Sequence, residues 1–339
     1  MIADASRTSI GKLPGTLRLL VDRRIGGSVS YLLRDEEALM QVPDEIRKCV
    51  GYVGVVTSPG SGPVPGGTFF LLSVPAGPRH VFLYAVTAAH VIDGVERDGR
   101  DLNVHLRVNL RTGGVAWASS RVLDWRFHPT KAGVDVAVLP LNPGILAAAD
   151  LLSVPITMAA TPEVLASRGL SHGDEVFYTG LFTKHVPDTR NIPIVRIGNI
   201  AALPEEPIPW RRERVSGTEL VTMDPPYLVE TRSIGGLSGS PVFVNLGGVR
   251  QQGRSVSMIA GPQPFYLLGL MHGHWDIDPS RVWTATVQQD SLREEMVNMG
   301  IGIVVPIDSI REVLDQPILK DPREAFVAAE TAADLPTAD

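Results

Sequence analysis

The segment from residue 234 to residue 244 reads Ile-Gly-Gly-Leu-Ser-Gly-Ser-Pro-Val-Phe-Val and places Ser238 in a run of small residues ahead of an apolar strand. Gly235, Gly236 and Gly239 carry no side chains, so backbone N–H groups beside the Ser238 hydroxyl can turn towards one point. A serine next to convergent N–H donors suits acyl transfer, because the serine attacks and the donors stabilise the oxyanion. The plainer alternative is a glycine-rich turn at a strand end. Ser238 is a candidate nucleophile only if the chain supplies a base and a carboxylate elsewhere.

The composition of the chain is that of an ordinary globular protein. It has 339 residues, of which 44% are hydrophobic and 20% charged, and its net charge of −6 argues against a broad nucleic-acid-binding face. The short basic run at residues 211–214 (Arg-Arg-Glu-Arg) is expected to be a solvated loop. The single cysteine, Cys49, excludes an intrachain disulfide and suits a reducing compartment. The N-terminus lacks a signal-peptide core and no apolar run reaches membrane-span length, so we expect a soluble, cytoplasmic protein with no membrane or nucleic-acid partner.

Short runs of β-branched and aromatic residues, separated by Gly and Pro, follow Cys49. Six of them have strand length and predict a small antiparallel barrel or sandwich: residues 50–57, 68–73, 81–86, 104–110, 115–123 and 134–139. An alanine- and proline-rich connection over residues 142–173 follows, with one expected helix at 162–168. Strand-like runs then resume at residues 175–180, 194–202, 220–223, 227–231, 241–245, 266–272 and 302–306. The second half therefore repeats the architecture of the first.

A base and a carboxylate both have candidates in the first half. Thr87-Ala88-Ala89-His90 places a histidine just beyond the end of an expected strand. Asp135 stands at the start of the apolar run Asp-Val-Ala-Val-Leu. If this acid is buried without a partner it costs several kcal/mol, and an imidazole N–H would provide one. Taken singly, His90 could be an ordinary polar residue at a strand end and Asp135 an ordinary turn aspartate.

The three motifs occur in the order His90, Asp135, Ser238, and in this order the chain resembles the trypsin-like (chymotrypsin-fold) serine proteases. The resemblance implies an all-β fold of two six-stranded antiparallel β-barrels with the active site between them. It makes Ser238 the nucleophile and His90 the general base and then acid. Asp135 would fix the imidazole tautomer, and the N–H groups of Gly236 and Ser238 would form the oxyanion hole. Leu237 departs from trypsin, which has an aspartate before the nucleophile, so activation by a newly cut N-terminus is not expected.

Further segments are similar to bacterial HtrA-type and glutamyl endopeptidases, and they extend the resemblance over about residues 46–316: residues 66–70, 172–180, 196–202 and 300–307. We therefore expect an N-terminal extension at 1–45, with a short amphipathic helix at 28–40, a first barrel at 46–165 and a second barrel at 166–318. A C-terminal helix is expected at 307–314 and a flexible tail at 319–339. No PDZ-like domain is expected after Pro306.

The resemblance also predicts a specificity pocket. Arg232 falls near the position of the pocket floor, and His272 and His274 lie on the strand that lines the pocket in the family. These groups would favour an acidic side chain before the scissile bond. The alternative is that Arg232 faces solvent and His272 only packs beside Asp135.

The same strand raises the possibility of a metal site, because His272, His274, Asp276 and Asp278 alternate along it. Neighbouring Gly and Pro residues favour a loop instead, so neither a metal nor a cofactor is expected.

The function expected from these motifs is a serine endopeptidase that hydrolyses peptide bonds in a protein or peptide substrate through an acyl-enzyme. The alternative is a catalytically silent peptide-binding or scaffold protein with a protease fold. We also expect a regulatory protein partner, or the N-terminal arm, to restrain the cleft.

Overall fold

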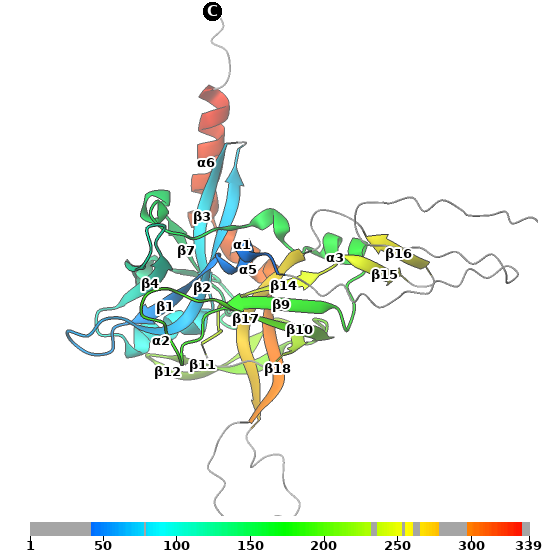
Figure 1. Cartoon of the computed structure of the whole chain (residues 1–339), viewed down its shortest axis with the longest axis horizontal. Coiled ribbons are helices and arrows are strands. Elements are labelled where there is room, and N and C mark those ends of the chain that lie inside the picture. The colour runs from blue at the N-terminus through cyan, green and yellow to red at the C-terminus, as the bar shows by residue number, and fades with distance from the viewer. Residues whose placement is uncertain are drawn as a thin grey trace, which may run out of the picture. The chain divides into compact units, whose positions relative to one another are not determined.

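The first half of the chain forms one antiparallel sheet with a short parallel addition. The computed structural model (Figure 1) describes residues 42–77, 79–231, 236–252, 255–259, 265–277 and 297–333. The strands of this sheet are β1 (Val50–Val55), β2 (Val64–Ala76), β3 (His80–Thr87), β4 (Asn103–Asn109), β5 (Val115–Arg121), β6 (Arg126–Phe127), β7 (Ala137–Leu141) and β8 (Val154–Pro155). Their order is β5-β4-β1-β2-β3-β7-β6, with β8 paired to β2. Residues 67–73 of β2 are buried without interruption, because this strand lies in the middle of the sheet.

The second half closes into a barrel. Its strands are β9 (Glu175–Gly180), β10 (Ile194–Ala202), β13 (Tyr227–Glu230), β14 (Pro241–Asn245), β17 (Phe265–Ile277) and β18 (Val297–Pro306). They close in the order β10-β13-β18-β17-β14-β9, and every pairing is antiparallel. The barrel core includes Tyr178, Val229, Val242, Leu268 and Val304, all with no exposed surface. Closure gives every strand two hydrogen-bonded neighbours.

The prediction of two closed six-stranded barrels is therefore met in part. The chain is mostly β and has one closed six-stranded barrel, but the first sheet has ends at β5 and β6 in the described residues. Two features of these strands explain why the sheet stays open there. β6 is only two residues long, and most of β5 is half-exposed. The two residues of β6 cannot form the continuous ladder with β5 that closure would require.

Two hairpins stand apart from these sheets. β11 (Ile208–Arg214) pairs with β12 (Gly217–Met223), and β15 (Gly248–Gln252) pairs with β16 (Ser255–Ile259). The run 211–214, expected to be a solvated loop, is therefore part of a strand, and Arg212 within it is buried. That prediction was wrong because the arginine has an acidic partner elsewhere in the fold.

The helices are short except at the C-terminal end. They are α1 (Asp44–Arg47), α2 (Ala89–Asp98), α3 (Pro162–Arg168), α5 (Ile307–Leu314) and α6 (Pro317–Ala333), with 3-10 turns at Val122–Asp124, Pro143–Leu146 and Ile156–Met158. The helices expected at 162–168 and 307–314 are confirmed; the Thr161 hydroxyl caps the first by accepting from the N–H of Val164. None of the helices in the described part of the chain is long and apolar enough to cross a membrane.

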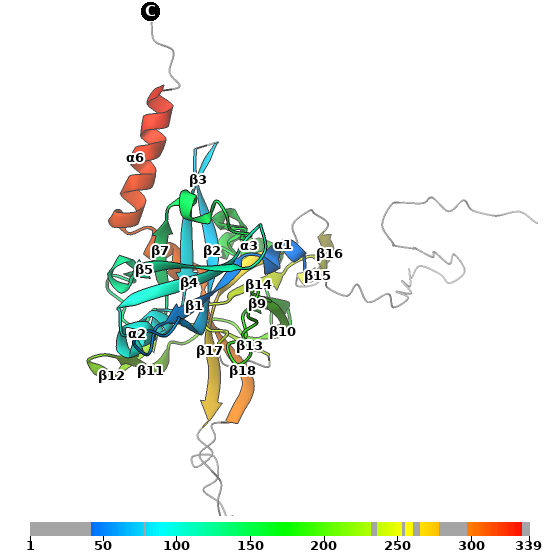
Figure 2. The ribbon, with the colours of Figure 1, turned by 60° about the vertical axis from the view of Figure 1, so that its left-hand side comes forward.

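The flexible tail predicted for residues 319–339 is instead a helix as far as Ala333. This helix, α6, lies beside the β2–β3 hairpin (Figures 1 and 2). Arg323 is buried and donates to the Tyr84 hydroxyl at 2.9 Å, and Phe326 packs edge-on against Phe82. These contacts with β3 hold α6 in place; sequence composition alone could not predict them. The expected extension at 1–45, including the helix at 28–40, lies outside the described residues as far as residue 41.

Candidate active site

His90 sits in the first turn of α2, directly after β3. The strand ends at Thr87, Ala88 stays extended (φ −71°, ψ 141°), and the helix begins at Ala89. The backbone N–H of His90 has no partner within the helix at this position, and it donates to Asp135 Oδ1 at 2.8 Å. One carboxylate oxygen therefore holds the main chain of His90 in place.

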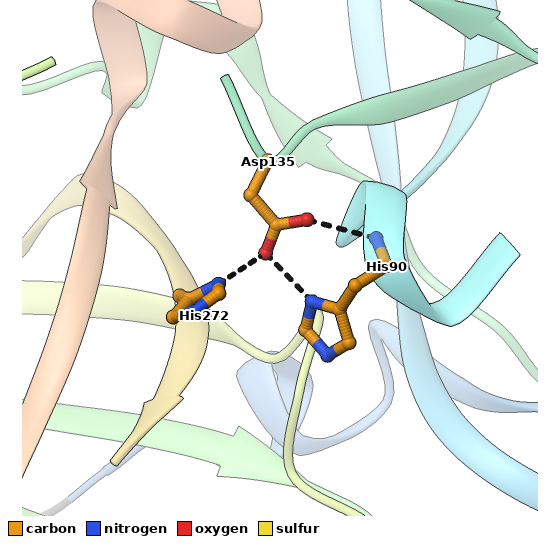
Figure 3. A group of neighbouring side chains, drawn as sticks. All are labelled: His90, Asp135 and His272. Carbon is orange, nitrogen blue, oxygen red and sulfur yellow. Dashed lines mark hydrogen bonds and ion pairs between the residues drawn. The ribbon is translucent and has the colours of Figure 1, made fainter. Parts of the chain in front are cut away.

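The other oxygen of Asp135 holds the His90 ring. His90 Nδ1 donates to Asp135 Oδ2 at 2.8 Å (Figure 3). Asp135 itself has no exposed surface. Burial would raise the pKa of the Asp135 carboxyl, but the charge and hydrogen bonds of the His90 and His272 imidazoles outweigh burial and hold that pKa well below its ordinary value. Burial would likewise lower the pKa of His90, and the Asp135 carboxylate reverses this, so the pKa of His90 is raised. The pair is thus an anionic acceptor beneath an imidazole that readily takes a proton.

A second imidazole reaches the same carboxylate. His272, on β17, places its Nδ1 2.5 Å from Asp135 Oδ2, and its ring centroid lies 5.1 Å from that of His90 (Figure 3). This is the arrangement in which His272 packs beside Asp135, one of the two alternatives for this residue. The His272 side chain thus contacts the Asp135 carboxylate from a strand of the closed barrel.

The turn that carries Ser238 docks on the first sheet. The N–H of Thr68 donates to the Ser238 carbonyl at 3.0 Å, and the Thr68 hydroxyl donates to the Gly236 carbonyl at 3.1 Å. Gly239 has a left-handed φ of +85°, and a Cβ there would overlap the Thr68 carbonyl and the Thr87 hydroxyl. The Ser238 turn therefore packs against the chain immediately before His90, and only glycine fits at position 239.

The backbone donors around Ser238 are available. In the described part of the chain, neither the N–H of Gly236 nor that of Ser238 has a hydrogen-bond partner, and Gly236 holds a φ of +97°. Among the same residues, the Ser238 hydroxyl makes no hydrogen bond to His90; such bonds often tighten only when substrate binds. Ser238 is partly exposed, whereas the Ser240 hydroxyl is fully buried. Of the two serines in the motif, only Ser238 is accessible to a ligand.

The β11–β12 hairpin holds the His90 and Asp135 segments together, and the sequence did not predict this. Trp210 packs edge-on against His272 (centroids 4.8 Å apart) and against His90 (6.4 Å), and its indole N–H donates to the Gly133 carbonyl. Arg212 forms a buried bidentate pair with Asp93 of α2.

The backbone of the Asp135 loop also touches this hairpin. Arg212 Nη1 donates to the Ala132 carbonyl at 2.7 Å, and a Cβ on Gly133 would overlap the Thr222 carbonyl of β12. The sequence carries no local signal for these contacts, because an arginine pattern of this kind usually marks a solvated face.

The structure describes two of the three predicted specificity residues, His272 and His274. Arg232 lies outside the described residues, as does Asp278 of the possible metal site. His274 is half-buried on β17, in register with Gly302 of β18. His272 therefore binds Asp135, and the specificity pocket itself stays a prediction.

One group of described side chains has the residue types of a metal site: His90, Asp135 and His272, whose ligand atoms lie within 4.8 Å of one another. Their Nδ1–Oδ2 separations are 2.8 and 2.5 Å. Ligands around a tetrahedral zinc ion stand roughly 3.3 Å apart, given bonds of about 2.0–2.1 Å. The geometry is therefore that of a hydrogen-bonded cluster.

A scan of the chain against protein-family models matches none of them, and a search of curated proteins returns no match.

Proposed function

We propose that this chain is a serine endopeptidase with a trypsin-like fold, which hydrolyses peptide bonds through an acyl-enzyme. In this proposal the open first sheet corresponds to the first barrel of the family and the closed barrel to the second. Ser238 is the nucleophile, His90 the general base, and Asp135 the group that orients the imidazole.

The observation that carries the proposal is the double hydrogen bond between His90 and Asp135. A carboxylate on Nδ1 directs the free Nε2 of the imidazole outward as the proton acceptor. The raised pKa of His90 suits a group that must take up a proton during the reaction. The Ser238 turn packs against the end of the strand that leads into His90, so the hydroxyl and the base come from adjacent segments.

In the proposed reaction, Ser238 Oγ attacks the carbonyl carbon of the scissile bond and its proton passes to His90 Nε2. The carbonyl oxygen takes the negative charge, and the N–H groups of Gly236 and Ser238 stabilise it, each by about 3–4 kcal/mol. His90 then gives the proton to the leaving amine as the C–N bond breaks. Water then attacks the acyl carbon as His90 Nε2 takes its proton. The bond between the acyl carbon and Ser238 Oγ breaks, the acid product leaves, and His90 returns the proton to Ser238 Oγ.

Labelling of the full chain with a fluorophosphonate probe tests the proposal. The wild type should form a covalent adduct at Ser238, and Ser238→Ala should form none. Ser240→Ala is the matched control, because the Ser240 hydroxyl is buried and the variant should label like the wild type. His90→Ala should label at least about 100-fold more slowly. If the wild type is well folded by circular dichroism but stays unlabelled, the endopeptidase proposal fails. Tight peptide binding without acylation would then support the alternative, a catalytically silent peptide-binding or scaffold protein.

Substrate choice and restraint remain predictions. An acidic residue before the scissile bond is expected from Arg232 and His274, and cleavage of a randomised peptide library tests it. Deleting residues 1–45 and measuring the labelling rate and stability tests whether that arm, rather than a partner protein, controls the cleft; unchanged values would remove the arm from this role.

A further inference from the structure

Asp135 accepts three hydrogen bonds, and two of them converge on one oxygen. Its Oδ1 accepts the His90 N–H at 2.8 Å, whereas Oδ2 accepts Nδ1 of His90 at 2.8 Å and Nδ1 of His272 at 2.5 Å (Figure 3). An ionised carboxylate can only accept, so both ring nitrogens act as N–H donors to it. The negative charge of Oδ2 is therefore shared between two imidazoles from different parts of the chain.

His272 is held in this orientation from both sides. Its neighbour Met271 exchanges two backbone hydrogen bonds with the Ser238 motif: the Met271 N–H donates to the Ser240 carbonyl, and the Gly239 N–H donates to the Met271 carbonyl, both at 2.8 Å. On the other side, the Trp210 ring makes a T-shaped contact with the His272 ring. The donor to Asp135 is thus fixed by the same strand that supports the proposed nucleophile.

A second N–H donor changes the effect of Asp135 on the proton affinity of His90. Stabilising the carboxylate with another N–H disperses its charge, so its pull on a proton at His90 becomes weaker. Among the described residues, the other charged groups that face His90 are Asp93 on its own helix, which favours the protonated ring, and Arg212 on β11, which opposes it. Within this described set, His272 is the side chain that acts through the Asp135 oxygen itself.

We propose that His272 is a positioning residue of this site: by sharing Asp135 Oδ2 with His90, it lowers the proton affinity of His90. His90 therefore remains a free base down to a lower pH than it would without His272. The inference rests on the proposed function for its catalytic meaning, but the proton affinity of His90 can be measured without any reaction.

Two substitutions separate the hydrogen bond from the ring. In His272→Asn, the amide Nδ2 occupies the place of the imidazole Nδ1 and can still donate to Asp135. In His272→Phe, the ring remains but the donor is lost. The phenylalanine variant should raise the pKa of His90 by roughly 0.5 to 1 pH unit, whereas the asparagine variant should stay close to the wild type.

The primary readout is an NMR titration of the His90 ring resonances, recorded in the Ser238→Ala background so that no chemistry is required. The second readout is the pH dependence of the fluorophosphonate labelling rate, whose acidic midpoint should move upwards in His272→Phe. His80→Asn is the control: it removes another carboxylate-bound histidine, paired with Glu330 at 2.7 Å at the far end of β3, and should leave His90 unchanged.

A role for His272 in packing alone would lower thermal stability mainly in His272→Asn, which loses the ring, and would leave the His90 titration where it was in both variants, which would overturn the proposal. A downward shift in His272→Phe, or equal shifts in both variants, would also overturn it. If the wild type does not label at all, the protease proposal fails, while the NMR titration still decides the role of His272.

Discussion

Among the arginine–carboxylate pairs of the described residues, the pair between Arg212 and Asp93 is the most buried and should be the costliest to break. Arg212 Nε lies 2.6 Å from Asp93 Oδ2 and Nη2 lies 3.1 Å from Oδ1, with side chains only 3% and 6% exposed. Nη1 also donates to the Ala132 carbonyl, and the guanidinium lies over the Phe127 ring. The pair joins β11 to α2, the helix that carries His90.

The loss of unfolding free energy depends on which charge remains buried without its partner. Arg212→Met leaves the Asp93 carboxylate buried without its guanidinium, and Asp93→Leu leaves a buried guanidinium without its carboxylate. Removing one partner of a buried pair costs about 3–5 kcal/mol of unfolding free energy. Replacing both charged residues with apolar residues of similar size is often nearly neutral for the unfolding free energy. The double variant should therefore unfold within about 1 kcal/mol of the wild type.

Urea unfolding, followed by fluorescence, measures all four corners of this double-mutant cycle. Arg97→Met is the matched control, because Arg97 and Glu213 also join α2 to β11 but are 37% and 63% exposed; it should cost at most about 1 kcal/mol. Both single variants of the buried pair should also label more slowly at Ser238, since His90 depends on the position of α2. Single variants that cost under about 1 kcal/mol, or a double variant that costs their sum, would refute the reasoning.

Two further predictions concern acid stability and the Ser238 turn. Asp135 stays ionised in the folded protein but takes up a proton at about pH 4 when unfolded, so the unfolding free energy should fall as pH drops below about 5. Urea unfolding between pH 3 and 7 should show a shallower fall of this free energy in Asp135→Asn. Equal slopes in the variant and the wild type would contradict the prediction. Thr68→Val removes a hydroxyl that donates to the Gly236 carbonyl and accepts from the Leu181 N–H, so it should lower stability by about 1–3 kcal/mol and slow labelling of Ser238. Thr68→Ser keeps both hydrogen bonds and should behave like the wild type. Equal losses of stability in Thr68→Ser and Thr68→Val would contradict a role for the hydroxyl.

Much of the candidate site could be predicted from the sequence because its motifs are local. A histidine just after a strand, an acid just before one, and a serine among glycines each depend on neighbouring residues. The pairing of His90 with Asp135 in the structure agrees with the partner expected for a buried acid. The C-terminal helix at 307–314 could be predicted for the same reason, because its apolar positions recur with helical spacing over about two turns.

The closure of the sheets could not be predicted from the strand-like runs. Strand content depends on residue type and alternation, whereas closure depends on whether the two end strands find each other. In the first sheet, β6 is too short to offer a ladder, so the sheet stays open, while six strands of the second half close completely. Likewise, α6 replaces an expected tail because Arg323 and Phe326 find partners on β3.

By itself, the sequence determined a mostly β chain with three ordered motifs around His90, Asp135 and Ser238. Only the tertiary structure decided that Arg212 is buried and that His272 donates to Asp135. The physical reason is the range of these contacts: Arg212 and Asp93 are 119 residues apart, and His272 and Asp135 are 137 apart. Whether a charged or titratable side chain is solvated or buried depends on such distant partners, and local sequence patterns carry no information about them.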